Sequence, residues 1–185
     1  MFVEQQIDIA PVFYRIFGEI SFFYSSIYAN YKNRQKPHKG WQINMLDQMK
    51  ALVREKNMCV LATDAGGKPY CSLMAYVTDG PCEEIYMVTH RNTQKYKNLM
   101  ENPAVSLLID SREKTPRHRV QALTVEGSFH KIEDDAKRTQ VRKMLIETHP
   151  HLSDFIDHAD AEIFCINVGS FLLLNGLSEA HFQAL

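Results

Sequence analysis

The sequence lacks the features that mark several specialised classes of protein. Basic and acidic residues nearly balance, with 21 Lys and Arg against 22 Asp and Glu, so no global charge draws the chain to nucleic acid or an acidic membrane. The four cysteines lie far apart, without the CxxC pairs of zinc and redox sites. No basic segment followed by an apolar core opens the chain, which predicts no cleavable signal. We therefore expect a cytoplasmic protein that binds no nucleic acid.

Residues 1–44 differ in character from the rest of the chain. Aromatic and aliphatic side chains recur at helical spacing from Phe13 to Tyr31, and a basic linker follows over residues 32–39. Charged residues and a glycine interrupt the apolar run, which predicts no membrane span. Three interpretations stay open: a helix that packs on the domain or a partner subunit, an interfacial membrane helix, or an extension translated upstream of a true start at Met45. We expect an N-terminal extension over 1–44 and one domain over 45–185.

From residue 45 onward, short β-rich runs alternate with tight turns. No strand is regularly followed by a crossover helix, which argues against a doubly wound sheet and favours an antiparallel barrel. Cys59, Cys71 and Cys165 fall inside strand-like runs and are expected to be buried. The pattern predicts six strands, at 58–63, 69–77, 84–89, 104–110, 120–132 and 162–174, and helices at 46–56, 94–100 and 133–147.

The turn after the third predicted strand carries the most specific chemistry. Thr89 ends that strand, Thr93 occupies an N-cap position, and Gln94 and Lys95 open the helix behind it. A lysine in a first helical turn is unfavourable by about 0.3–1 kcal/mol unless an anion binds there. A phosphate would be held by free backbone N–H groups, the threonine hydroxyls and the Lys95 ammonium. The alternative is a solvated helix start whose lysines point into water.

Four segments around this turn keep a fixed order. They are residues 72–77 (Ser-Leu-Met-Ala-Tyr-Val), 85–89 (Ile-Tyr-Met-Val-Thr), 92–95 (Asn-Thr-Gln-Lys) and 98–107 (Asn-Leu-Met-Glu-Asn-Pro-Ala-Val-Ser-Leu). Together they resemble the FMN-binding split barrel of the pyridoxamine 5′-phosphate oxidase superfamily, over a stretch from about Met45 to the C-terminus. The resemblance implies a mainly β, six-stranded Greek-key split barrel with flanking helices. It also implies a homodimer with FMN in the groove between the two subunits.

The resemblance also assigns roles to residues. In the family the first segment lies along the flavin ring, here through the backbone amides of Leu73 to Ala75. The strand end Val88-Thr89 and the turn Thr93-Gln94-Lys95 correspond to the residues that hold the phosphate and ribityl chain. A glutamine approaches the ring near Gln121, although the alignment could equally place Ala122 there. The candidate cofactor-binding residues are Ser72, Leu73, Met74, Ala75, Tyr76, Val88, Thr89, Thr93, Gln94, Lys95 and Gln121.

Departures from the family pattern limit the function that can be inferred. True pyridoxamine phosphate oxidases have a lysine where this chain has Val77 and an arginine where it has Gln94, and residues 175–185 do not reproduce their substrate motif. The vitamin B6 substrate is therefore not expected. The sequence predicts an FMN-dependent oxidoreductase acting on an unassigned small molecule, with no catalytic residue identified.

Two other function classes stay open. A haem-binding or haem-degrading split barrel would use the C-terminal His181 to ligate iron, whereas the simpler interpretation is a frayed, solvated tail histidine. A non-enzymatic flavin-binding module would need only the cofactor site. His149, His151 and His158 follow the last helix, and we expect solvated loop histidines there rather than a metal site.

Overall fold

A computed structural model describes residues 39–112, 120–176 and 179–185. The chain divides into two units, residues 1–42 and 43–185, and the second contains the whole sheet. The helical spacing predicted between Phe13 and Tyr31 and the basic linker before Lys39 lie outside the described residues. So do residues 113–119, which lie between the fourth and fifth predicted strands. Among the described helices, none is long and apolar enough to cross a membrane.

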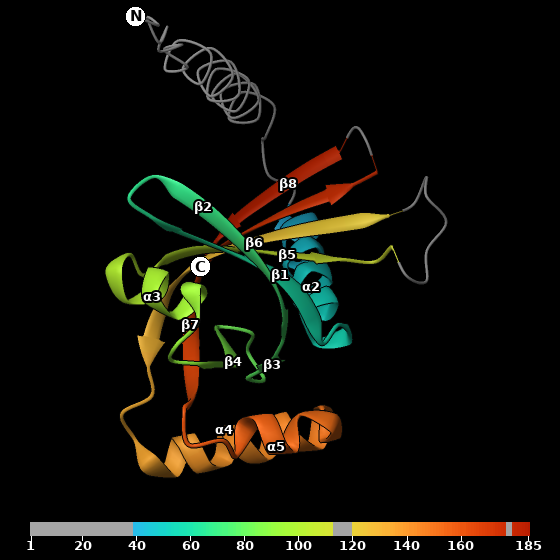
Figure 1. The fold of residues 1–185 in the computed structure, drawn as a ribbon. Coiled ribbons are helices and arrows are strands. Elements are labelled where there is room, and N and C mark those ends of the chain that lie inside the picture. Colours follow the sequence, from blue (N-terminus) through green and yellow to red (C-terminus); the bar gives the residue numbers. More distant parts are fainter. Residues whose placement is uncertain (1–38, 113–119, 177–178) are drawn as a thin grey trace, which may run out of the picture. The chain divides into compact units, whose positions relative to one another are not determined.

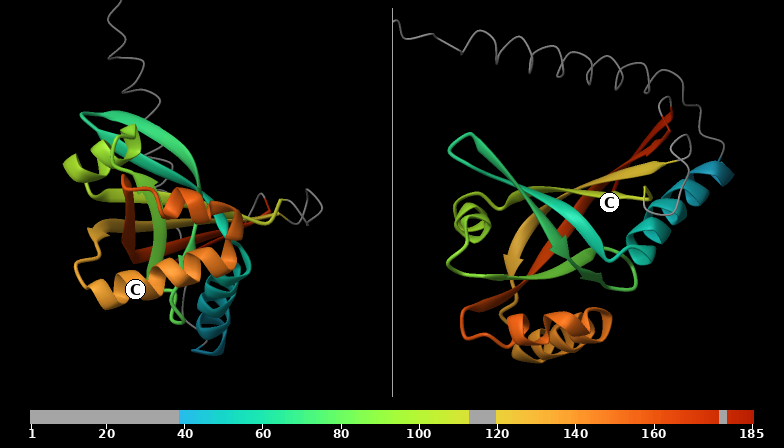
Figure 2. Two further views of the ribbon diagram at one scale, coloured as in Figure 1. Left: turned by 60° about the horizontal axis from the view of Figure 1, so that its bottom comes forward. Right: turned by 45° about the vertical axis from the view of Figure 1, so that its right-hand side comes forward.

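One antiparallel sheet of eight strands forms the domain. The strand order is β2-β1-β5-β6-β7-β4-β3, and β8 pairs with the second half of β7 (Figure 1). The sheet curls around its own interior into a half-open barrel (Figure 2). The strands are β1 (Met58–Ala65), β2 (Lys68–Ala75), β3 (Val77–Thr78), β4 (Glu84–His90), β5 (Ala104–Asp110), β6 (Gln121–Lys131), β7 (Ala161–Asn175) and β8 (Glu179–Ala184).

The predicted mainly β, antiparallel split barrel is confirmed, with two strands more than the six predicted. The run predicted as one strand over 69–77 divides at Tyr76, whose N–H donates to the Asn57 carbonyl at 3.0 Å, and β3 then pairs with β4. The C-terminal tail pairs with β7 as β8, because the turn at Gly176, with φ of 62°, reverses the chain onto the sheet. Tail residues therefore belong to the domain.

The helices flank the curled sheet. They are α2 (Lys39–Glu55), α3 (Gln94–Glu101), α4 (Asp135–Thr148) and α5 (Ser153–Ile156). Helix α2 buries Met49, Leu52 and Val53 in the barrel interior, as their spacing predicts. Helix α4 begins at Asp135 because Asp134 caps it, its Oδ1 accepting from the Ala136 N–H at 2.8 Å.

Side chains alternate between two cores. One face of β4 and β7 fills the barrel interior, where Met87, Phe164 and Ile166 are fully buried. The other face of the same strands packs against α4 and α5 through a second core that includes Val88 and Ile163. Because successive residues of a strand point to opposite faces, each of these strands contributes to both cores.

The cysteines are all free thiols. Cys59, Cys82 and Cys165 are buried, and burial raises the pKa of the Cys59 and Cys165 thiols to about 12. The prediction that Cys71 is buried is wrong, because Cys71 lies on the outer face of the edge strand β2. Successive residues of β2 point to opposite faces of the sheet, and this alternation places Cys71 on the exposed face. The β-rich residues around it predict a strand but not the face.

Gly127 marks a close approach of β6 and β7. The register shifts at residues 126 and 127, and a Cβ at 127 would meet the Asn167 carbonyl oxygen and lie 2.8 Å from Ile166 Cγ2. We predict that Gly127→Ala lowers the free energy of unfolding by about 1–3 kcal/mol, as overpacking does. Urea denaturation measures this. Gly80→Ala is the control, since a Cβ at 80 meets no atom within 4 Å; equal losses in both variants would refute the close-approach explanation.

Candidate functional site

Two threonine hydroxyls build the start of α3. Thr93 Oγ1 donates to the His90 carbonyl at 2.8 Å and accepts from the Tyr96 N–H at 3.4 Å, so Thr93 is the N-cap that the sequence predicts. Thr89 Oγ1 lies 3.1 Å from Thr93 Oγ1. Since the Thr93 proton is directed at His90, Thr89 donates to Thr93. Both hydroxyl protons are therefore engaged in shaping the turn.

The head of α3 keeps unused donors. The N–H groups of Gln94 and Lys95 open the helix, and within the described chain neither has an acceptor. The Lys95 side chain is half-buried, makes no ion pair or hydrogen bond with any described residue, and has its pKa lowered by burial. Two backbone donors and an unpaired ammonium at a positive helix end make a site that an anion would neutralise.

The turn before α3 is fastened to the start of β7. The Arg91 N–H donates to the Asp160 carbonyl at 3.0 Å, and Arg91 Nε donates to Glu162 Oε2 at 2.8 Å. The His90 ring stacks on Phe155, with centroids 3.9 Å apart. Sequence reasoning did not identify Arg91, because its partner lies 71 residues further along the chain. These contacts hold the turn in one conformation.

The predicted ring-contacting segment lies on an edge strand. Within the described sheet β2 pairs only with β1, so its other backbone edge is free to bond a ligand. Leu73 is 72% exposed, whereas Met74 and Tyr76 are buried, and the Tyr76 hydroxyl donates to the Val53 carbonyl at 2.8 Å. The side chains of Met74 and Tyr76 are thus committed to the core, and the strand offers a ligand its backbone edge and Leu73.

A row of side chains, apolar except for one threonine, crosses the outer face of the sheet from β2 to β8. Strand registers place its six members side by side, one from each of β2, β1, β5, β6, β7 and β8. Leu73 and Leu108 are exposed and the others are half-buried, and within the described residues no helix covers the row. The members of this outer row are Leu73, Val60, Leu108, Thr124, Leu172 and Phe182.

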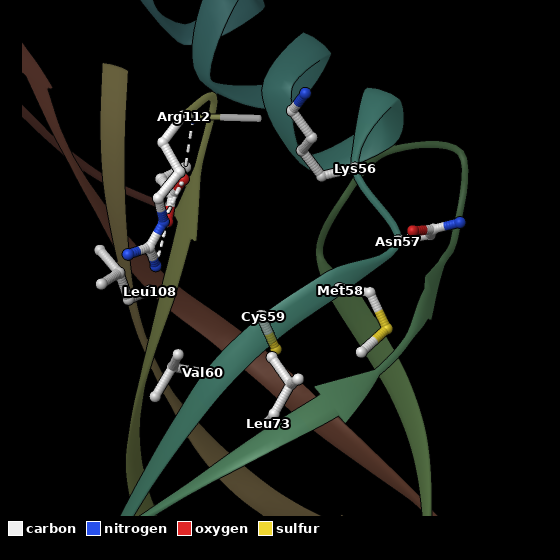
Figure 3. A pocket seen from close by; sticks show the side chains of 9 residues that line it. Lys56, Asn57, Met58, Cys59, Val60, Leu73, Leu108 and Arg112 are labelled. Carbon is white, nitrogen blue, oxygen red and sulfur yellow. Dashed lines mark hydrogen bonds and ion pairs between the residues drawn. The ribbon is translucent and has the colours of Figure 1, made fainter. Parts of the chain in front are cut away.

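A pocket of about 100 Å³ opens beside the outer row (Figure 3). Val60, Leu73 and Leu108 form its apolar wall. Arg112 lies at its edge, with the guanidinium beside Leu108, and pairs with Asp110 through Nη2 at 2.7 Å. Lys56 also lines it. Ligand pockets typically measure about 300–1,000 Å³, so a single chain encloses too little space here for a cofactor.

Two further predicted cofactor residues, besides Met74 and Tyr76, lie away from the outer face. Val88 is buried in the second core under α4 and α5. Gln121 is half-buried and its Nε2 donates to Asn175 Oδ1 at 2.8 Å. Gln121 shares the inner face with Leu123, whereas Ala122 shares the outer face with Leu108. The register thus gives the outer position to Ala122, which the sequence alignment offered as the alternative.

The four histidines singled out in the sequence differ in burial and in hydrogen bonding. His149 is buried, and its Nε2 lies 3.1 Å from the Tyr76 carbonyl, so the expectation of a solvated residue is wrong for His149. His149 also ends α4, since its N–H donates to the Leu145 carbonyl at 2.8 Å. His151 and His158 are exposed. The expectation of a frayed, solvated tail is wrong for His181. It lies in β8, pairs in register with Leu173 on the inner face, and its Nε2 is buried without a partner among the described residues.

A second polar cluster fastens α4 to β4. Glu84 accepts Lys137 Nζ at 2.8 and 2.9 Å and the Tyr86 hydroxyl at 2.5 Å. Burial opposes ionisation, but these bonds hold the pKa of the Glu84 carboxyl below its usual value. Burial and the neighbouring Glu84 both raise the pKa of Tyr86. Since the donors and the carboxylate satisfy each other, the cluster is a structural link.

Comparisons with known proteins agree with this architecture. Residues 45–170, more than half of the chain, match the model of the family described as pyridoxamine 5′-phosphate oxidase. A search of curated protein sequences gave no match.

Solved structures with this fold bind different cofactors. A haem-binding protein from Mycobacterium smegmatis is 19% identical with a TM-score of 0.67, and the alignment covers 75% of this chain and 57% of that one. The haem storage protein HutZ from Vibrio cholerae is 23% identical over 70% of this chain and 93% of its own, with a TM-score of 0.57. An FAD-binding protein from Mesorhizobium loti is 16% identical over 68% and 91%, with a TM-score of 0.58.

At these identities the structural likeness shows the fold alone. The family match rests on the sequence itself and covers β1 to β6, the turn at Thr93 and most of β7. Together with the curled antiparallel sheet, it shows that this chain belongs to the pyridoxamine 5′-phosphate oxidase family of split-barrel proteins.

Proposed function

We propose that this protein is an FMN-binding flavoprotein that acts, as a homodimer, in oxidation or reduction of a small molecule. The observation that carries the proposal is the head of α3, where two backbone N–H groups and the Lys95 ammonium have no partner among the described residues. The terminal phosphate of FMN has the charge and acceptor oxygens that such a group of donors binds.

A solvated helix start explains the head of α3 less well. A lysine that pointed into water would keep its hydration, whereas Lys95 is half-buried and its pKa is lowered by that burial. The positive end of the helix dipole adds a further repulsion. A bound phosphate would remove both penalties.

The edge of β2 is proposed to hold the flavin ring. Backbone groups of Leu73 to Ala75 on the unpaired edge would bond ring heteroatoms, and Ser72 and Leu73 would border it. When bound, FMN supplies the electron transfer, and the protein supplies placement, charge and exclusion of water. Thr89 and Thr93 would shape the phosphate turn, with Val88 beside Thr89 in β4, and Tyr76 would anchor the end of the ring-binding segment through its bond to Val53. The contact of Gln121 with the ring stays a prediction, and Ala122 is better placed for it because it lies on the outer face.

A homodimer would complete the site. The outer row leaves Leu73 and Leu108 exposed on a sheet face that no described helix covers, and such apolar faces mark interaction surfaces. The small pocket beside the row encloses about 100 Å³, less than a cofactor needs, so a second copy would provide the missing wall. The groove between two such faces is where a flavin can lie, because the barrel interior is filled.

A haem site remains the alternative, since two structural neighbours bind or store haem. The Nε2 of His181, which has no partner among the described residues, would be the iron ligand. However, His181 points to the inner face with Leu173, on the opposite side of the sheet from Leu73 and Leu108. Flavin is therefore the better supported ligand.

We predict that the purified protein shows a flavin absorption spectrum after FMN addition, and that Thr93→Ala combined with Lys95→Ala weakens FMN binding about 10- to 100-fold. The lost charge-assisted bond of Lys95 contributes about 1.5–3 kcal/mol, which solvent exposure reduces, and loss of the Thr93 cap removes the hydrogen bonds that shape the turn. Fluorescence titration measures the affinity, and circular dichroism confirms that the barrel stays folded. Unchanged affinity would refute the phosphate site. A Soret band after haem addition, lost in His181→Ala, would support haem instead.

The ligand-free protein should gain stability when Lys95 is replaced. We predict that Lys95→Met raises the free energy of unfolding at pH 7 by about 0.3–1 kcal/mol, because it removes an unpaired cation at a helix N-terminus. The folded-state pKa of Lys95 is lowered, so the gain should shrink as the pH rises toward the usual lysine value of 10.5. Thermal unfolding of apoprotein measures this. Exposed Lys97→Met is the control, and a loss of stability specific to Lys95→Met would mean that Lys95 has a stabilising partner.

The outer row should hold the dimer together. We predict that Leu73→Asp converts a dimer to a folded monomer, because a charge would be buried at the interface while the monomer keeps it in water. Light scattering coupled to size exclusion measures the mass. Met100→Asp is the control, since Met100 is 51% exposed on α3 and outside the row. A wild-type monomer at high concentration, or a dimer in Leu73→Asp, would contradict this interface.

A further inference from the structure

Three polar side chains link the head of α3 to strands β1 and β2. Gln94 Nε2 donates to Asn98 Oδ1 at 2.8 Å, one helical turn further along α3. Asn98 Nδ2 donates to Thr63 Oγ1 of β1 at 3.1 Å, and Thr63 Oγ1 donates to the Tyr70 carbonyl of β2 at 3.3 Å. Gln94, Asn98 and Thr63 thus form a hydrogen-bonded series, which connects the proposed phosphate turn to the proposed ring strand without a gap.

The inner members of this series are fully enclosed. Asn98 is 2% exposed and Thr63 is 3% exposed, in a core otherwise made of apolar side chains. A buried amide or hydroxyl is tolerated because its hydrogen bonds are made, and those bonds fix the geometry of the groups they join. Asn98 joins α3 to β1, and Thr63 bonds the residue opposite it in the β1–β2 register.

Gln94 forms the outer end of the series. Its side chain is exposed, and one amide N–H is directed at Asn98 rather than outward. The bond holds Gln94 against the body of α3, which leaves the backbone N–H groups of Gln94 and Lys95 uncovered at the helix head. Asn98 therefore affects the anion site through Gln94 and does not itself line the site.

We propose that Asn98 and Thr63 are positioning residues that set the distance between the phosphate-binding head of α3 and the ring-binding edge of β2. The inference rests on the proposed FMN function. A ligand with two anchored ends binds tightly only when both anchors are held at the spacing that the ligand spans. The buried series provides that fixed spacing, because it ties α3 to the hairpin β1–β2, beside which α3 lies (Figures 1 and 2).

Riboflavin separates a positioning role from a general structural one. It carries the ring and ribityl chain of FMN but no phosphate, so the ratio of the riboflavin Kd to the FMN Kd reports how well the phosphate anchor cooperates with the ring anchor. A loss of stability alone would leave that ratio unchanged in the folded protein. Loss of spacing would lower it, because only FMN uses both anchors.

The experiment compares Thr63→Val, Thr63→Ser and Asn98→Ala with the wild type by fluorescence titration with both ligands. Thr63→Val keeps the side-chain shape without the hydroxyl, and Thr63→Ser keeps the hydroxyl. We expect the ratio to fall about threefold to tenfold in Thr63→Val and Asn98→Ala, the effect of one lost hydrogen bond. The riboflavin Kd should stay constant, and Thr63→Ser should keep the wild-type ratio.

Ser170→Ala is the matched control. Ser170 is 7% exposed, and its hydroxyl donates to Glu126 Oε2 at 3.0 Å, so this variant loses a buried hydroxyl bond outside the series. It should lower the melting temperature and leave the ratio unchanged.

Each other outcome counts against the proposal. An unchanged ratio in folded Thr63→Val overturns the positioning role while leaving the FMN function intact, and Thr63→Val decides the matter even if Asn98→Ala fails to fold. Equal weakening of both ligands would assign the series to general stability. Wild-type protein that binds FMN no tighter than riboflavin would overturn the phosphate site, and the positioning role with it.

Discussion

The interior of this barrel is filled by the protein's own side chains, and that constraint governs the rest of the structure. Leu61, Leu107, Ile109, Leu123 and Phe171 are buried to within 1% of full enclosure, so no ligand can enter between the strands. In a small barrel of this kind a ligand can bind only at the outer face, the strand edges or the helix ends. The uncovered outer row, the free edge of β2 and the head of α3 are therefore the places where function can be built.

Stability and proposed function conflict at the head of α3. A half-buried lysine at the positive end of a helix destabilises the ligand-free fold, and the surrounding turn nevertheless holds it in place through Thr93, Arg91 and the start of β7. Such local violations of stability rules concentrate at functional sites. The same turn is organised by bonds that no ligand would touch, so its shape would exist before FMN arrives.

Sequence patterns predicted the parts of this site that depend on neighbouring residues. The N-cap Thr93, the short helix behind it and the strand at 104–110 follow from local hydrogen bonding and β propensity. Other features depend on contacts across the chain: the Gln94 bond to a buried asparagine that in turn reaches Thr63, and the enclosure of His149 against Tyr76. No spacing rule links residues 35 or 73 positions apart.

The sequence by itself determined the family, the order of the six predicted strands and three predicted helices, and the N-cap at Thr93, because these depend on local propensity and on ordered motifs. Tertiary structure alone decided which side of the sheet each residue occupies. A shift of one residue in register exchanges the two faces of a strand. Strand pairing was therefore needed to choose between Gln121 and Ala122 and to show that His181 points inward. Pairing also turned the predicted tail into β8, since its hydrogen-bond partners lie in β7.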